Sequence, residues 1–186
     1  MHPAPPTASG LLVIGAWLAL FFVMLRRPRT GGPAARRDRW SLAGMAIQGA
    51  SFIIAWNDWA IGTPAAPVLR AGAVLLALGS VWTAARAVQA LGKHFSLTAR
   101  TLEEHELVTA GPYASVRHPI YSAMLGLLVS TTITFSRPLT LLASIPLFLA
   151  GTAVRVRRED RLLAEAFGES WETYATRVPA LLPRWR

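Results

Sequence analysis

Five long apolar runs are spaced along the chain, with polar segments between them. The first extends from Met1 to Leu25 without a charged side chain and is followed at once by Arg26 and Arg27. A helix that spans a bilayer needs about 20 apolar residues, with a range of roughly 17–25. A cleaved signal peptide would carry its positive charges before the apolar run and not after it. The pattern therefore predicts an uncleaved membrane helix at about residues 9–26.

The last two apolar runs are separated by a single charged residue. Neither the run before Arg137 nor the run after it contains a charge, so we predict a tight helical hairpin with its tip at this arginine. Pro146 lies inside the second arm, where a proline can kink a helix. The helices predicted after the first are 42–60, 67–90, 119–136 and 138–154.

This pattern predicts an all-α fold: a polytopic membrane protein with about five transmembrane helices, the last two forming the hairpin, and short cytosolic helices. Composition agrees, because 53% of the 186 residues are apolar and only 16% are charged, whereas soluble domains carry roughly 25% charged residues. The chain contains no cysteine. Disulfides, thiolate metal ligands and cysteine nucleophiles are therefore excluded.

The positive charges predict the orientation in the membrane. With five spans, three basic regions fall on one side: 26–39, 86–117 and 155–186. Only Arg70 and Arg137 fall on the other side. Cytosolic loops carry the excess of lysine and arginine, so the N-terminus is expected outside and the C-terminus in the cytosol. Topology thus accounts for the net charge of +9, and no nucleic-acid partner is expected. The alanine- and arginine-rich composition favours a bacterial inner membrane.

Two polar segments on the predicted cytosolic side hold the residues that could carry chemistry. Segments 91–118 and 155–186 contain three of the four histidines and eight of the ten acidic residues. Pro119 is expected to start a helix, because a proline at the first helical turn lacks only an N–H that would be unpaired anyway. Arg117 and His118 would then lie at the membrane surface. The histidines are eleven and thirteen residues apart and match no local ligand pattern, so no metal site is expected.

The last segment has a helical apolar pattern that is expected to end at Gly168, and Ser170 is predicted to cap a short helix after it. Glu159 lies a few residues beyond the fifth predicted span, among arginines at 155, 158 and 161. A carboxylate so close to an apolar boundary is a candidate ligand for a cationic group. Taken alone, the segment could equally be an amphipathic surface helix with solvated charges.

Two strings in this region resemble a known family. HELVTAGPYASVRHPIY covers His105 to Tyr121, and REDRLLAEAFGESWETYATRVPALLP covers Arg158 to Pro183. Together they resemble the isoprenylcysteine carboxyl methyltransferase family of membrane enzymes and its relatives among phospholipid methyltransferases. The resemblance extends over about residues 91–186, which would form the catalytic region with the hairpin 119–154 and a C-terminal amphipathic segment. Residues 1–90 match only as three transmembrane helices with a basic cytosolic loop.

The resemblance implies S-adenosylmethionine as cofactor, with S-adenosylhomocysteine as product. It implies that the adenosine is held by His105, Leu107, Val108, Gly111 and Tyr113. It further implies that His118 and Tyr121 line the same pocket, that Glu159 is the partner of the methionine amino group, and that Arg177 is a substrate-side or catalytic residue. The catalytic residues would then be Arg177, Glu159 and Tyr121. The chain departs from the family at two positions, Ala123 in place of a frequent glycine and Asp160 in place of a glutamate.

The function so implied is methyl transfer to a lipophilic acceptor at the cytosolic membrane face. The acceptor could be a carboxylate, an amine or a thiol. A carboxylate needs no base, only a cation such as Arg177 to position it, whereas an amine must first lose a proton. One alternative is a phospholipid N-methyltransferase, and another is a non-catalytic membrane binding or assembly module of the same fold. The expected partners are a lipophilic small molecule or lipid and the membrane lipids, while the oligomeric state stays open.

Overall fold

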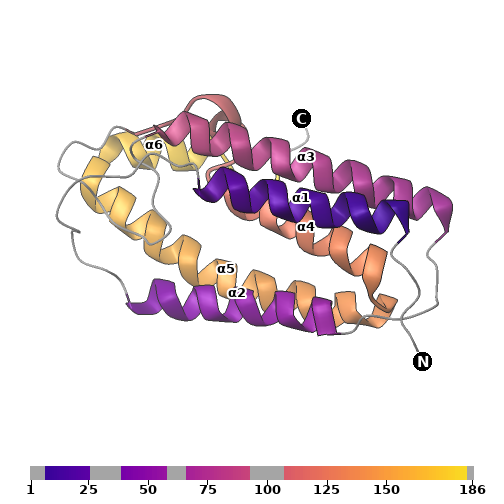
Figure 1. The fold of residues 1–186 in the computed structure, drawn as a ribbon. Coiled ribbons are helices and arrows are strands. Elements are labelled where there is room, and N and C mark those ends of the chain that lie inside the picture. The colour runs from indigo at the N-terminus through magenta and orange to yellow at the C-terminus, as the bar shows by residue number, and fades with distance from the viewer. Residues whose placement is uncertain (1–6, 26–38, 58–65, 93–106, 184–186) are drawn as a thin grey trace.

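The computed structural model describes residues 7–25, 39–57, 66–92 and 107–183. This part of the chain is helical. Figure 1 shows five long helices lying roughly side by side with alternating direction, while α6 and the short 3-10 helix η2 lie at one end. The elements are α1 (Ala8–Leu25), α2 (Arg39–Asn57), α3 (Pro67–Leu91), η2 (Gly111–Ala114), α4 (Pro119–Phe135), α5 (Pro138–Phe167) and α6 (Glu169–Arg177).

Three of these helices are long and apolar enough to cross a membrane: α1, α3 and the Leu139–Phe167 part of α5. The apolar stretches Trp40–Trp56 and Pro119–Phe135 are shorter. All five predicted segments are thus helical, and three of them are candidate spans by length and composition. A stretch of 17 residues rises only about 26 Å, slightly less than a hydrocarbon core of about 30 Å.

The outer faces of the long helices are apolar, as a lipid-facing surface requires. Large side chains such as Phe21 on α1, Leu75 on α3 and Leu142 on α5 are 63%, 70% and 73% exposed. A soluble helix would place such residues on a buried stripe, and a helix that is apolar on all sides is typical of a membrane span. Lipid is the environment in which these faces cost no free energy.

The helix predicted at 138–154 does not end at residue 154. It continues through Pro146 and past the end of the apolar run to Phe167, a length of 30 residues or about 45 Å. Nothing in the charged stretch breaks a helix, so the first stop is Gly168, whose φ of 52° lies in the left-handed region. Arg155, Glu159 and Asp160 are therefore carried on the same helix as the apolar arm.

Gly168 also corrects the predicted start of the last helix. Ser170 does not cap this helix, because α6 begins at Glu169 with Gly168 itself at the N-cap position. The N–H of Trp171 donates to the Gly168 carbonyl at 3.1 Å. One glycine thus ends α5 and starts α6, and the chain turns sharply at this point.

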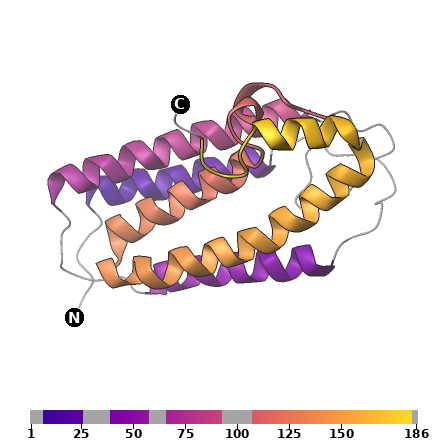
Figure 2. The ribbon, with the colours of Figure 1, turned by 180° about the vertical axis from the view of Figure 1, so that it is seen from behind.

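Two pairs of helices make most of the contacts, α2 with α5 and α3 with α4. α4 and α5 are joined by Ser136 and Arg137, where the sequence predicts the hairpin tip, and then diverge (Figures 1 and 2). A tight hairpin is therefore not confirmed, since each arm packs mainly on a different partner. Aromatic rings occupy the space between the two pairs, with Trp17 and Phe52 centroids 4.9 Å apart and Phe52 and Phe148 centroids 5.7 Å apart.

Candidate functional site

The site begins with the segment before α4, which the C-terminal segment holds in place. The N–H of Arg117 donates to the Pro179 carbonyl at 2.8 Å, and the N–H of His118 donates to the Ala180 carbonyl at 3.0 Å. The Tyr174 hydroxyl donates to the Tyr113 carbonyl at 2.7 Å. Because the first two bonds join backbone groups on both sides, they fix where the Arg117 and His118 side chains start.

His118 lies between two carboxylates of α5. Its Nε2 is 2.8 Å from Asp160 Oδ1, and its Nδ1 is 3.4 Å from Glu159 Oε2. Asp160 Oδ2 accepts from Arg117 Nη1 at 3.1 Å. The Tyr121 hydroxyl donates to Glu159 Oε1. Residues about 40 positions apart in the sequence thus form one hydrogen-bonded group, which we call the carboxylate cluster: Arg117, His118, Tyr121, Glu159 and Asp160.

The surroundings of His118 favour its charged form. Burial alone would lower the pKa of the imidazole, but hydrogen bonds to Asp160 and Glu159 and the charges of both carboxylates outweigh it, so the pKa is raised. A ring that donates from both nitrogens must carry both protons. The raised pKa therefore favours the doubly protonated ring, which can donate to both acids.

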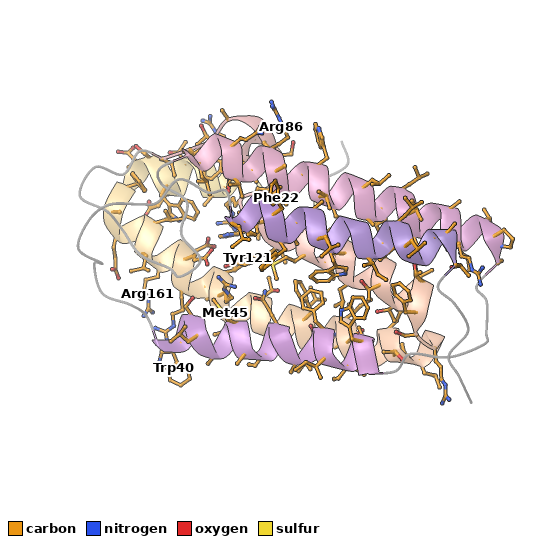
Figure 3. All side chains as sticks on the ribbon, viewed as in Figure 1. Phe22, Trp40, Met45, Arg86, Tyr121 and Arg161 are labelled. Atoms are coloured by element: carbon orange, nitrogen blue, oxygen red, sulfur yellow. The ribbon has the colours of Figure 1, made fainter. Side chains whose placement is uncertain are left out.

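Arg155 approaches the cluster from one turn earlier on α5. Its guanidinium lies 4.8 Å from the centre of the Tyr121 ring, and its Nη2 is 3.8 Å from Glu159 Oε1. Its Nη1 donates to Gln48 Oε1 on α2 at 3.1 Å. Glu159 is thus faced by the Tyr121 hydroxyl, the His118 ring and the Arg155 guanidinium. In Figure 3, Tyr121 lies between the α1–α4 side and the α2–α5 side of the bundle.

An apolar hollow adjoins the cluster. It holds about 380 Å³ of space free of atoms, part of it open to solvent. Leu107, Val108 and Tyr113 line it, as the family resemblance implies, and so do Arg117 and four residues of the C-terminal region: Leu163, Phe167, Trp171 and Tyr174. Arg117 connects the two parts, because it lines the hollow and also bonds to Asp160. Burial raises the pKa of Tyr174 to about 12, so this wall of the hollow stays uncharged at neutral pH.

The other predicted site residues have different positions. Gly111 makes the expected turn, with a φ of 63° that favours glycine. Arg177 is exposed at the end of α6, and no hydrogen bond or ion pair joins it to another described residue. His105 lies outside the described residues. Within the described segments, no group of three His, Cys, Asp or Glu side chains is placed to hold a metal ion.

The sequence reasoning left several members of the site without a role. Arg117 was predicted only to lie at the membrane surface, and Arg155 was one of several arginines near Glu159. For Trp171 and Tyr174 the sequence does hold a signal, because their spacing places two aromatic side chains on one face of a short helix after Gly168. The aromatic ring of Trp171 lies 5.5 Å from the Arg117 guanidinium.

Comparison with known proteins shows the family to which the chain belongs. Residues 68–170 match the family model described as phospholipid methyltransferase. The chain belongs to this family. The match contains η2, α4, the hollow-lining residues up to Phe167 and every member of the carboxylate cluster, whereas α1, α2 and Gln48 lie outside it.

Curated relatives of this phospholipid methyltransferase family member have two kinds of name. Over 112 residues it is 38% identical to the cobalt-zinc-cadmium resistance protein CzcN of Cupriavidus metallidurans, covering 60% of this chain and 50% of that one. Over 114 residues it is 32% identical to protein-S-isoprenylcysteine O-methyltransferase B of Arabidopsis thaliana, covering 60% and 57%. The predicted family resemblance is therefore confirmed. The chain spans about half the length of the curated relatives it matches.

Proposed function

We propose that this protein transfers a methyl group from S-adenosylmethionine to a lipophilic acceptor at a membrane surface. One observation carries the proposal: in a member of the phospholipid methyltransferase family, the carboxylate cluster adjoins an aromatic hollow at one end of an apolar helical bundle. A ligand that carries both a charged group and a flat apolar group would place the first against the carboxylate cluster and the second in the adjoining hollow.

The residues present fit this cofactor. Its amino group is a cation, and Glu159 offers a carboxylate whose side chain keeps 22% of its surface exposed. Its carboxylate needs a cation, and the buried Nε of Arg117 has no hydrogen-bond partner among the described residues. Its adenine needs an apolar slot, which Tyr113, Phe167 and Trp171 line. Buried polar atoms without partners are rare in folded proteins, so an open donor beside this hollow supports a ligand there.

When bound, S-adenosylmethionine supplies an electrophilic methyl group on a sulfonium. The residues of the site orient the two reactants and exclude water, which is the main contribution an enzyme makes to such a displacement. Glu159 holds the amino acid end, and the apolar walls hold the adenosine. Because the raised pKa of His118 favours its charged form, Glu159 is the better placed of the two to take a proton from an amine acceptor. A carboxylate acceptor requires no such step.

Arg177 remains a proposed substrate-side residue. It is exposed on α6 and stands outside the cluster, where a cation could meet the head of an acceptor arriving from the membrane. The order of the elements supports an N-terminus outside and a C-terminus in the cytosol of a bacterial inner membrane. The basic regions adjoin the ends of α1, α3 and α5 that lie at the same end of the bundle as α6 (Figure 1).

Methyl transfer in membrane vesicles tests this function and orientation together. Vesicles carrying the protein are given S-adenosylmethionine labelled on its methyl group, which does not cross the membrane, and the label in extracted lipid is counted. Inverted vesicles, which expose the cytosolic face, should label lipid, and right-side-out vesicles should not. Label no higher than in vesicles without the protein would contradict the proposal, and labelling only by right-side-out vesicles would reverse the orientation.

The acceptor class has two candidates, each favoured by a comparison. The family description points to phospholipids, and the name of the plant relative points to the carboxylate of an isoprenylcysteine. Mild base separates them, because a methyl ester is hydrolysed to volatile methanol whereas an N-methyl group is retained. Volatile label after base would identify a carboxylate acceptor. Label that migrates with methylated phosphatidylethanolamine before base treatment, and that stays non-volatile after it, would identify the phospholipid. A non-catalytic module would give neither.

A further inference from the structure

A buried polar side chain connects α2 to the carboxylate cluster. Gln48 is 1% exposed and uses both ends of its amide. Its Nε2 donates to Thr152 Oγ1 at 2.7 Å, and its Oε1 accepts from Arg155 Nη1 at 3.1 Å. Both partners lie on α5, Thr152 two turns and Arg155 one turn before Glu159. These two bonds leave the amide a single orientation, with its carbonyl toward the guanidinium.

The backbones of α2 and α5 come close together at this point because two glycines face each other. A Cβ added to Gly44 would lie 2.8 Å from the Gly151 carbonyl oxygen and 2.6 Å from Arg155 Cγ. A Cβ added to Gly151 would lie 2.7 Å from the Gly44 carbonyl oxygen. Small residues allow such close helix crossings in membranes. The crossing brings Gln48 within hydrogen-bond reach of a side chain more than one hundred positions later.

The position of Arg155 determines how available Glu159 is. Its Nη2 stays 3.8 Å from Glu159 Oε1, longer than the 2.7–2.9 Å of a charge-assisted hydrogen bond. Gln48 on one side and the Tyr121 ring on the other hold the guanidinium at this separation. Without the amide, Arg155 could close on Glu159 and occupy the carboxylate that an incoming ammonium needs.

We propose that Gln48 is a positioning residue for Glu159 and acts through Arg155. The proposal rests on the proposed function, since the group that Glu159 receives is the amino group of the cofactor. It assigns a part in the site to α2, which lies outside the residues matched by the family.

Titration of detergent-solubilised full-length protein with S-adenosylhomocysteine tests this role. Gln48→Met keeps the volume and removes both hydrogen bonds, and it should weaken binding about tenfold, or roughly 1.4 kcal/mol. Gln48→Glu keeps an acceptor for Arg155 and for the Thr152 hydroxyl, and it should bind within about twofold of the wild type. Ser51→Ala is the matched control, because Ser51 is equally buried one turn along α2 and donates only to the Gln48 backbone.

Unweakened binding by Gln48→Met, or binding by Gln48→Glu as weak as that of Gln48→Met, would overturn the proposal. Should Gln48→Met fail to fold, Gln48→Asn takes its place, because it keeps the amide but is too short to reach both partners. A change in melting temperature without a change in affinity would mean a structural role only.

A double-mutant cycle measured in the absence of cofactor separates this proposal from the proposed function. Gln48 and Glu159 do not touch, so if Arg155 couples them, the effects of Gln48→Met and Glu159→Gln on the melting temperature should not add. In an Arg155→Met background the two effects should add. Additive effects in both backgrounds would contradict the positioning role even if the wild type binds the cofactor. If the wild type does not bind S-adenosylhomocysteine but the effects of Gln48→Met and Glu159→Gln are non-additive, only the proposed function is contradicted.

Discussion

Glu159 and Asp160 are neighbours on α5, yet their partners divide them into two roles. Asp160 uses one oxygen on Arg117 and the other on His118, so both oxygens serve to hold the segment before α4. Glu159 faces Tyr121, His118 and Arg155, and its side chain remains partly exposed. This arrangement supports Glu159 as the acid proposed to bind the cofactor and Asp160 as the one that holds the fold, a division that the Glu-Asp pair in the sequence does not reveal.

The raised pKa of His118 gives a prediction at this scale. A group whose pKa is higher in the folded state stabilises the fold fully below its unfolded pKa, about 6.5, and loses this contribution as pH rises through the folded pKa. Glu159 and Asp160 favour the charged ring, while Arg117 and Arg155 lie nearby with the same charge. The wild type should therefore melt well above His118→Gln at pH 6.

Melting curves of the two proteins between about pH 6 and 9 check this expectation. The difference should shrink as the pH rises, starting from about 1.5–3 kcal/mol, the usual contribution of hydrogen bonds to charged groups. A difference that is the same at every pH would show that His118 contributes by packing and not by its charge.

At the scale of the elements, the apolar runs and the arginines predict where the helices lie in the sequence. They do not predict which helices pack against each other. Apolar runs give α1 to α5, because length and composition suffice for a helix in lipid. The partners of α4 and α5 depend instead on where small residues face each other, as at Gly44 and Gly151. A sequence does not reveal that α2 lies against α5. For the same reason, no pattern in α2 marks Gln48 as a contact of Arg155.

The crossing of α2 and α5 can be tested by adding one methyl group. Gly151→Ala places a Cβ 2.7 Å from the Gly44 carbonyl oxygen and 2.9 Å from the Gln48 nitrogen, so the helices must separate. Overpacking of this kind costs about 1–3 kcal/mol, and the melting temperature should fall accordingly. Gly49→Ala on α2 is the control, because its Cβ would meet nothing within 4 Å and alanine favours the helix by about 1 kcal/mol. Equal effects of both substitutions would argue against the crossing.

At the scale of the whole molecule, the fold joins two segments that the sequence separates by the length of two apolar helices. Residues 107–121 precede α4 and form its first turn, and residues 155–181 follow the apolar part of α5. Because α4 and α5 run in opposite directions, α5 ends at the end of the bundle where α4 begins (Figure 1). The backbone bonds of Arg117 and His118 to Pro179 and Ala180 then join the two segments. The motifs predict the joining of Tyr121, His118 and Glu159. The hollow also needs Trp171 and Tyr174, which only the turn at Gly168 places there.

The binding of cofactor at this end of the bundle is the central claim, and a titration with S-adenosylhomocysteine tests it most directly. The wild type should bind, and Glu159→Gln should bind about ten- to a hundredfold more weakly, because it loses a charge-assisted bond of about 1.5–3 kcal/mol. Glu165→Gln, an exposed acid on the same helix, should bind like the wild type. Absence of binding by the wild type, or equal binding by all three proteins, would contradict the account.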